Sequence, residues 1–299
     1  MNQSEMRDKI KGGDGFIAAL DQSGGSTPKA LAGYGVDENA WSSDEEMFGL
    51  IHDMRARIIT SPCFSGEKVI GAILFERTMD GQVDGKPTPA ALTERGIVPF
   101  IKIDKGLEEE RDGVQLMKPM PDLDALLSRA KSVGVFGTKE RSVINQANEA
   151  GIAAIVGQQF EVAFQVIRHG LVPIIEPEVN IKSTDRAASD AILRDEILRH
   201  LDRLPEGEEV MLKLSIPAEA GTFQALVDHP RVLRVVALSG GFSRADACAE
   251  LAKNPGMIAS FSRALLSDLR HGQDDGEFDR TLGTAIDEIY SASTSKIPA

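Results

Sequence analysis

Eight short apolar runs, separated by segments with helical spacing, constrain the fold of this chain more than any other feature. Each run ends in charge, glycine or serine. The runs are apolar throughout rather than at alternate positions, which is typical of strands covered on both faces of a parallel sheet. They lie at residues 16–21, 69–75, 98–105, 133–141, 171–178, 209–217, 233–241 and 257–263.

The segments between the runs indicate that helices alternate with strands. Residues 123–130 and 188–201, for example, carry apolar side chains at helical spacing. Eight such units in 299 residues fit one (β/α)8 TIM barrel, which typically takes about 250 residues. We therefore predict an α/β fold with a single barrel domain over residues 1–299. A doubly wound open sheet is the main alternative, but residues 21–26 fit a dinucleotide-binding turn poorly.

An isolated lysine, Lys213, lies in the middle of the apolar run at 209–217. A buried cation loses its hydration, so it is costly unless it is paired, neutralised or used. Burial and neighbouring positive charge favour the free amine, which can attack a carbonyl and form a Schiff base. A lysine at a strand end can also extend into water. The choice between these interpretations depends on what the other strands bring to the same place.

Charged side chains gather at the C-terminal ends of the predicted strands. In a barrel these ends converge on one mouth, where active sites are built. The mixture of cations with several carboxylates suits an anionic substrate that undergoes proton transfer. The predicted mouth collects Asp21, Lys102, Asp104, Lys105, Lys139, Arg141, Glu176, Glu178, Lys213, Ser239 and Arg263.

The overall composition argues against several classes of protein. A formal net charge of -13 disfavours nucleic acid or an anionic membrane as a partner. Two cysteines, Cys63 and Cys248, are too few for a disulfide framework or a thiol-rich metal site, and the five histidines lack metal-ligand spacing. No signal peptide or uninterrupted membrane-spanning run is evident. We expect a soluble, cytoplasmic protein that uses no metal and no cofactor.

Eight motifs, one for each predicted strand, resemble class I fructose-bisphosphate aldolase in order and spacing. The motifs are Asp21-Gln-Ser-Gly-Gly-Ser26, Ile73-Leu-Phe75, Ile101-Lys-Ile-Asp-Lys-Gly106, Lys139-Glu-Arg141, Val172-Pro-Ile-Ile-Glu-Pro-Glu178, Leu212-Lys213, Leu238-Ser-Gly-Gly241 and Phe261-Ser-Arg-Ala-Leu265. The chain is similar to the shorter bacterial form of that family. The resemblance implies a metal-independent lyase that cleaves fructose 1,6-bisphosphate through a lysine Schiff base, acting as a homo-oligomer.

The resemblance also implies three residues that act on the substrate. Lys213 resembles the lysine that attacks the C2 ketone and becomes the protonated imine. Glu176 resembles the acid that protonates the carbinolamine oxygen so that water can leave. Asp21 resembles the residue that hydrogen-bonds the C4 hydroxyl and helps to remove its proton during cleavage.

Three further charged residues are similar to groups that surround the imine in the family. Lys139 resembles the second lysine beside the imine, whose charge acts on its neighbours. Arg141 resembles a flanking cation. Glu178 is either a catalytic group or a partner for a neighbouring cation, and the sequence leaves both open.

Two phosphate subsites follow from the same resemblance. The expected C6-phosphate site consists of Lys102, Ser23 and Ser26. The expected C1-phosphate cradle consists of Ser239, Gly240, Gly241 and Arg263. Glycines let backbone N–H groups approach phosphate closely, and an arginine adds a fork of charged donors.

The chain departs from the animal members of the family at two points. Gln22 stands where they usually carry glutamate. Animal members also end in a long flexible tail, whose terminal tyrosine assists proton exchange at C3. The late tyrosine of this chain, Tyr290, lies in a predicted helix instead. The group that returns the C3 proton is therefore open.

Three functions remain possible on the sequence alone. The first is a Schiff-base aldolase for fructose 1,6-bisphosphate, with sedoheptulose 1,7-bisphosphate as a second substrate. Another lysine-dependent barrel enzyme, such as a transaldolase, would need only one phosphate subsite. A catalytically silent barrel used as a scaffold would have lost Lys213, Glu176 or Asp21, all of which are present.

Overall fold

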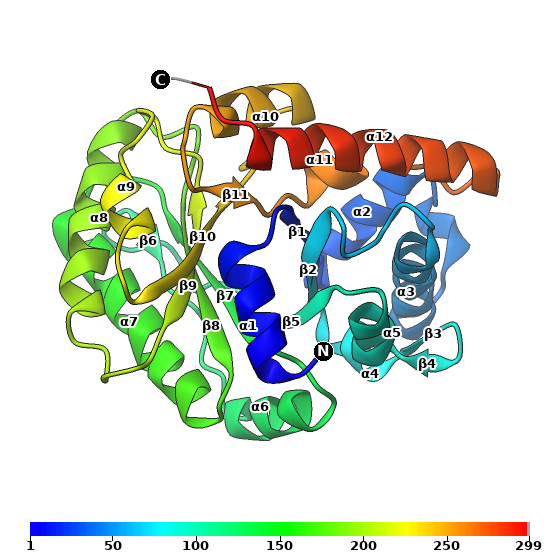
Figure 1. Ribbon diagram of the computed structural model, residues 1–299, viewed down its shortest axis with the longest axis horizontal. Coiled ribbons are helices and arrows are strands. Elements are labelled where there is room, and N and C mark those ends of the chain that lie inside the picture. The colour runs from blue at the N-terminus through cyan, green and yellow to red at the C-terminus, as the bar shows by residue number, and fades with distance from the viewer. Residues whose placement is uncertain (298–299) are drawn as a thin grey trace.

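Eight parallel strands form a nearly closed barrel in the computed structural model, which describes residues 1–297 (Figure 1). In order around the barrel they are β1 (Phe16–Leu20), β2 (Val69–Leu74), β5 (Val98–Lys102), β7 (Gly137–Ile144), β8 (Val172–Val179), β9 (Val210–Ser215), β10 (Val232–Leu238) and β11 (Ile258–Ala259). The backbone N–H of Ala19 donates a 3.2 Å hydrogen bond to the carbonyl of Phe261, which joins the last strand to the first. The predicted (β/α)8 barrel is confirmed.

Helices connect the strands and cover the outside of the barrel. The longer ones are α3 (Asp44–Thr60), α6 (Leu123–Ser132), α7 (Glu149–Arg168), α8 (Arg186–Leu201), α10 (Arg244–Ala252) and α12 (Asp275–Thr294). Shorter ones are α2 (Thr27–Tyr34), α4 (Glu76–Asp80), α5 (Thr88–Glu94), α9 (Gln224–Val227) and α11 (Arg263–Leu266), with 3-10 turns η1 (Gly24–Ser26) and η2 (Glu38–Ala40). Four of these helices begin at polar side chains that accept a backbone N–H three residues on, namely Ser43, Asn148, Ser243 and Asp274, and Asn2 caps the helix before the first strand in the same way.

The structure adds short strands that the apolar runs did not reveal. A two-stranded hairpin, β3 (Gln82–Val83) and β4 (Lys86–Pro87), turns through Asp84 and Gly85, which both have positive φ. A further strand, β6 (Val114–Gln115), pairs antiparallel with the end of β7. The strand predicted over 133–141 starts later, because Val133 and Gly134 belong to the turn that ends α6, and it runs further, to Ile144, where β6 pairs with its last residues.

Alternation along the strands separates two hydrophobic layers. The side chains that fill the barrel interior include Ile17, Ala19, Phe100, Ile174, Met211, Val236 and Ile258. The neighbouring residues on each strand point outward and pack on the helices. Because successive side chains face opposite sides of a strand, the residues two positions after Ala19, Phe100, Ile174 and Met211 also point inward. Those residues are charged, and they form the next layer toward the mouth.

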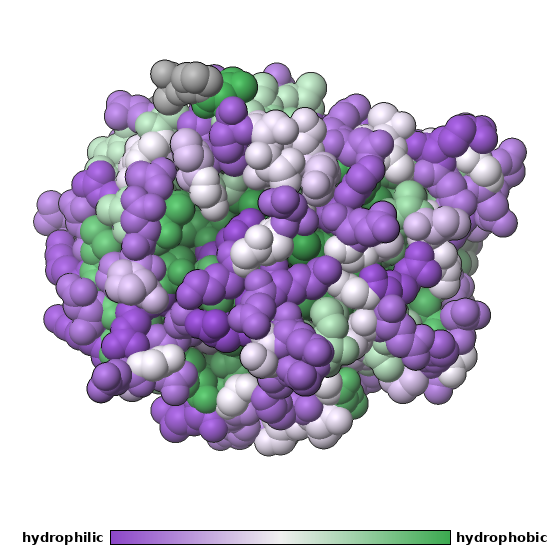
Figure 2. Space-filling model, in the orientation of Figure 1, coloured by the Kyte–Doolittle hydropathy of each residue, from purple (hydrophilic) through white to green (hydrophobic). Residues whose placement is uncertain are grey.

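A helix before the first strand closes the opposite end of the barrel. This helix, α1 (Gln3–Gly12), crosses in front of the strands in Figure 1 and buries Met6 and Ile10 against the interior cluster. The outer side of α1 is polar, and Figure 2 shows this face of the molecule as largely hydrophilic. The interior is thus sealed at one end and accessible from the other.

One described helix, α7, is long and apolar enough by length and composition alone to cross a membrane. The sequence contains no uninterrupted apolar run there, and the helix has polar side chains such as Glu161. Its buried side, which includes Ile152, Ile155 and Phe160, belongs to the hydrophobic core. In this fold α7 packs against β8 and α8 as one of the outer helices of the barrel.

Candidate active site

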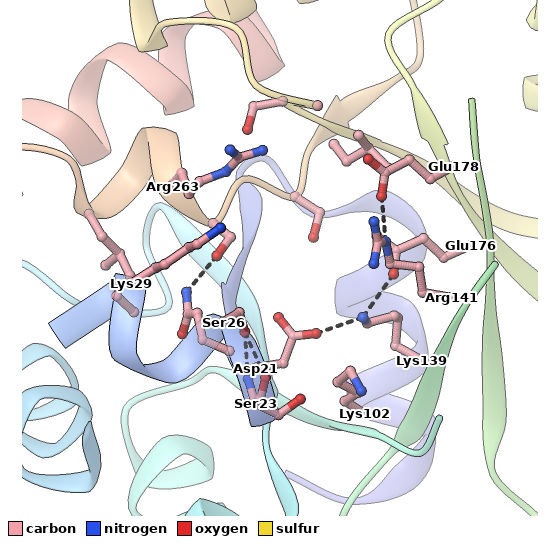
Figure 3. Close-up of a pocket in the computed structure, with 18 of the residues that line it drawn as sticks. Asp21, Ser23, Ser26, Lys29, Lys102, Lys139, Arg141, Glu176, Glu178 and Arg263 are labelled. Carbon is pink, nitrogen blue, oxygen red and sulfur yellow. Dashed lines mark hydrogen bonds and ion pairs between the residues drawn. The ribbon is translucent and has the colours of Figure 1, made fainter. Parts of the chain in front are cut away.

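A cavity of about 870 Å³ lies at the C-terminal ends of the barrel strands (Figure 3). Twelve of the thirteen predicted site residues line it: Asp21, Ser23, Ser26, Lys102, Lys139, Arg141, Glu176, Glu178, Lys213, Ser239, Gly240 and Arg263. The thirteenth, Gly241, lies just behind, since a Cβ atom built on it would be 3.6 Å from Arg263 Nη2. Lys105, which the sequence placed at the mouth, instead pairs with Glu76 at 2.8 Å.

Four charged side chains from four strands meet at the base of this cavity. Lys139 Nζ lies 2.6 Å from Asp21 Oδ2 and 2.8 Å from Glu176 Oε2. Lys213 Nζ lies 3.1 Å from Glu176 Oε1. All four are almost completely buried, and two cations balance two carboxylates. Pairing of this kind offsets the cost of removing the charges from water.

The electrostatics of this cluster differ from group to group. Burial raises the pKa of Asp21, but Lys139, Lys213 and Lys102 together outweigh it and hold the pKa well below the ordinary value. Asp21 is therefore a carboxylate at neutral pH. Burial lowers the pKa of Lys139, but Asp21 and Glu176 outweigh it, so its pKa lies above that of a free lysine. Lys139 is thus a fixed cation between two carboxylates.

Lys213 has fewer partners than Lys139, and this distinguishes the two buried amines. Among the described residues, Lys139 forms two ion pairs and Lys213 forms one, to Glu176. Lys213 also faces the cavity. An amine that is oriented by one carboxylate and otherwise open to the cavity is in position to meet a carbonyl carbon.

Two further ion pairs line the same cavity. Arg141 Nε donates to Glu178 Oε2 at 2.5 Å, so Glu178 has the cationic partner that the sequence analysis left open. Lys102 Nζ lies 2.7 Å from Asp104 Oδ1 and also donates to the Asp104 carbonyl. The Arg141–Glu178 pair is partly exposed, whereas Lys102 and Asp104 are mostly buried.

The turn after β1 places Ser23 and Ser26 in the lining of the cavity. Ser26 Oγ accepts from the backbone N–H of Ser23 and donates to the Ser23 carbonyl, which shapes η1. Lys29, on the first turn of α2, also lines the cavity (Figure 3) and is a residue that the sequence analysis missed. Its position three residues after Ser26, on the same side of a helix, is the signal that could have identified it.

A second group of donors follows β10 and β11. Gly240 and Gly241 have φ values of 59° and 116°, which disfavour other residues. A Cβ atom on Gly240 would also lie 2.6 Å from Ile181 Cγ2. Arg263 opens α11 beside this turn. The backbone after β10 can therefore approach an anion closely while Arg263 supplies a charged fork.

Metal-binding geometry is not found at this site. Across residues 1–297, no group of three or more His, Cys, Asp or Glu side chains could hold a metal ion. The carboxylates in the cavity contact lysines and arginines instead.

Comparisons with known proteins identify a family by sequence and a fold by structure. A family model described as fructose-bisphosphate aldolase class-I matches residues 4–216, which include Asp21, Lys139, Glu176 and Lys213. Among solved structures, the chain is similar to fructose-bisphosphate aldolase from Plasmodium falciparum in complex with TRAP and a small-molecule inhibitor. The TM-score is 0.81 at 19% identity, over 99% of this chain and 96% of that one. A Corynebacterium glutamicum protein matches with a TM-score of 0.55 at 15% identity, over 97% and 92%. At these identities the structural likeness concerns the fold.

Proposed function

The chain belongs to the class I fructose-bisphosphate aldolase family, and we propose that it cleaves fructose 1,6-bisphosphate reversibly through a Schiff base on Lys213. The products are dihydroxyacetone phosphate and glyceraldehyde 3-phosphate. The observation that carries the proposal is the buried Lys213 amine, which faces the cavity at 3.1 Å from Glu176. Lys139, which contacts the same glutamate, has a raised pKa and stays positively charged.

The first half of the reaction builds the imine. Lys213 first passes a proton to Glu176, which lies 3.1 Å away, and the neutral Nζ then attacks the C2 carbonyl and forms a carbinolamine. Glu176, whose carboxyl group contacts the reacting amine, gives a proton to the carbinolamine oxygen so that water leaves. The protonated imine that results draws electrons from the C3–C4 bond.

The second half breaks that bond. Asp21, ionised because of the surrounding lysines, accepts the proton of the C4 hydroxyl. The C3–C4 bonding electrons then move into the imine, which becomes an enamine, and the aldehyde product forms. Lys139 holds Asp21 and Glu176 in place throughout, since its amine contacts both carboxylates.

Two separate groups of cations support a substrate with two phosphates. Arg263, Ser239 and the following glycines would bind the C1-phosphate. Lys102, Ser23 and Ser26, with Lys29 beside them, would bind the C6-phosphate. The first group comes from β10 and β11, the usual place for a phosphate in this fold, and the second comes from β1, α2 and β5. A single-phosphate relative would need only the first.

Borohydride trapping tests the proposal directly. Reduction in the presence of dihydroxyacetone phosphate should add the triose to Lys213, as peptide mapping by mass spectrometry would show, and activity should survive a strong chelator. Lys213→Met should abolish both labelling and turnover. Lys105→Met is the matched control, because Lys105 pairs with Glu76 outside the cavity, and it should behave as wild type. Labelling of another lysine, or loss of activity with chelator, would contradict the Schiff-base assignment.

A further inference from the structure

A completely buried arginine beside the active site has neutral hydrogen-bond partners instead of a carboxylate. Arg55, on α3, is 0% exposed. Within residues 1–297 it forms no salt bridge, although the other large buried cations near the cavity do. Burying a guanidinium without a carboxylate partner costs free energy, so the presence of Arg55 at this position needs an explanation beyond packing.

The donors of Arg55 hold the turn that follows β1. Nη1 donates to Thr78 Oγ1 at 2.7 Å, which anchors the guanidinium on α4. Nη2 donates to the backbone carbonyl of Gln22 and, at 3.3 Å, to the Gln22 side-chain oxygen. Gln22 directly follows Asp21. The backbone next to the proposed C4-hydroxyl base is therefore fixed by a charged donor.

The charge of Arg55 also acts on Asp21. Burial lowers the pKa of Arg55 to about 10, and attraction to Asp21 opposes that effect. The guanidinium stays charged at neutral pH. Its positive charge therefore supports the carboxylate form of Asp21.

The side chain of Gln22 extends this contact to the other side of the mouth. Its Nε2 donates to Ser262 Oγ at 2.5 Å, and Ser262 directly precedes Arg263. Arg55 can only donate hydrogen bonds, so it attracts the amide oxygen of Gln22 and leaves the amide NH2 to face Ser262. One side chain thus bridges the ends of β1 and β11, which are adjacent in the barrel.

We propose that Arg55 is a positioning residue for the reaction, which acts through Gln22 to fix both the turn that carries Asp21 and the turn that carries Arg263. The proposal rests on the Schiff-base cleavage proposed above. A glutamate at position 22 would pair with Arg55 directly and would place an acceptor, not a donor, opposite Ser262. The glutamine therefore sets the direction of the hydrogen bonds between the two turns.

The test compares turnover for each active site that can be trapped as an imine. In Arg55→Met, the protein that folds should still be trapped on Lys213 with dihydroxyacetone phosphate. Its kcat per trapped site for fructose 1,6-bisphosphate should fall roughly 10- to 100-fold. The reason is that small displacements of a catalytic group cost rates of that order. Arg55→Lys, which keeps the charge and one line of donation, should recover part of the loss.

Gln22→Met separates the two contacts made at residue 22, the one from Arg55 to the backbone carbonyl and the one from the Gln22 side chain to Ser262. This variant keeps the bond from Arg55 to the backbone carbonyl of residue 22 but loses the bond to Ser262. KM for the bisphosphate should rise roughly 3- to 10-fold, as expected for one lost hydrogen bond, with kcat nearly unchanged. The reason is that the contact that fixes the turn carrying Arg263 is lost, whereas the contact that fixes the turn carrying Asp21 is kept.

Arg95→Met is the matched control. Arg95, at the C-terminal end of α5, also donates to neutral partners, the carbonyls of Phe64 and Ser61, and none of these three residues lines the cavity. Its loss should lower stability without changing turnover per trapped site. If Arg55→Met and Gln22→Met keep wild-type kcat and KM per trapped site, Arg55 is only structural. Should Arg55→Met fail to fold, an unchanged KM in Gln22→Met is enough to decide against the proposal. Absence of any trapped imine in the wild type would instead overturn the Schiff-base function.

Discussion

Asp21 illustrates how the chemistry of one residue depends on neighbours that are distant in the sequence. On its own a buried aspartate favours the protonated form. Lys139, Lys213 and Lys102, from three other strands, reverse that preference and keep it ionised. Because its pKa is lowered, Asp21 stays unprotonated at neutral pH. The proposed base for the C4 hydroxyl has to be in that form.

Asp21→Ala should separate imine formation from cleavage. The variant should still give the borohydride-trapped imine with fructose 1,6-bisphosphate, because Lys213 and Glu176 remain paired. Turnover should fall roughly 10²- to 10⁴-fold, the usual contribution of one proton-transfer group. Steady-state kinetics and trapping on the same preparation provide the measurement, with Asp21→Asn as the isosteric comparison. Near wild-type turnover in either variant would make Asp21 a structural residue.

At the level of elements, strand alternation decides which charged residues meet. Lys102, Glu176 and Lys213 each lie two residues after an interior side chain of their strand, and Lys139 lies two residues after Gly137, where a Cβ atom would meet the interior residue Phe100. The turns after β1 and β10 then add the donors of the two proposed phosphate sites. Because these turns belong to different elements, each phosphate site can be weakened separately.

Arg263→Ala and Lys102→Ala should weaken different ligands. A charge-assisted contact to phosphate contributes about 1.5 to 3 kcal/mol, or roughly 10- to 150-fold in affinity. Arg263→Ala should weaken both fructose 1,6-bisphosphate and dihydroxyacetone phosphate. Lys102→Ala should weaken the bisphosphate and glyceraldehyde 3-phosphate but largely spare dihydroxyacetone phosphate, as calorimetry or inhibition constants would show. Equal losses for all ligands in both variants would favour the single-phosphate alternative.

For the whole molecule, the two ends of the barrel have different roles. The mouth holds the charged cluster, and the other end is covered by α1. Lys296 Nζ donates to the carbonyls of Leu251, Met257 and Ala292, at 3.2, 2.6 and 2.9 Å. Met257 directly precedes β11, so this contact lies toward the N-terminal end of that strand. Tyr290 lies at the same end, beside Lys68, which directly precedes β2.

Lys296→Ala should therefore affect stability and not chemistry. It removes one hydrogen bond from each of three carbonyls, near the ends of α10 and α12 and in the loop before β11, which should lower the free energy of unfolding by about 1 to 3 kcal/mol. In Lys296→Ala, exchange of the C3 proton of dihydroxyacetone phosphate with solvent should stay at the wild-type rate. The same exchange rate is expected for Tyr290→Phe. Urea denaturation and deuterium exchange measure the two quantities. A loss of exchange in either variant would show that this segment takes part in the proton transfer.

The sequence by itself determined the barrel, because eight continuous apolar runs with helical segments between them can bury both faces of each strand in few other ways. It also identified Lys213 and the charged strand ends, since charge inside an apolar run is visible without a structure. Only the tertiary structure decided which charges pair. It placed Lys139 between Asp21 and Glu176, turned Lys105 toward Glu76, and gave Glu178 to Arg141. It also brought Arg55 and Lys29 to the site from helices, where a charged residue looks like any solvated one. Pairing and desolvation depend on distances between strands and helices, and local pattern does not contain those distances.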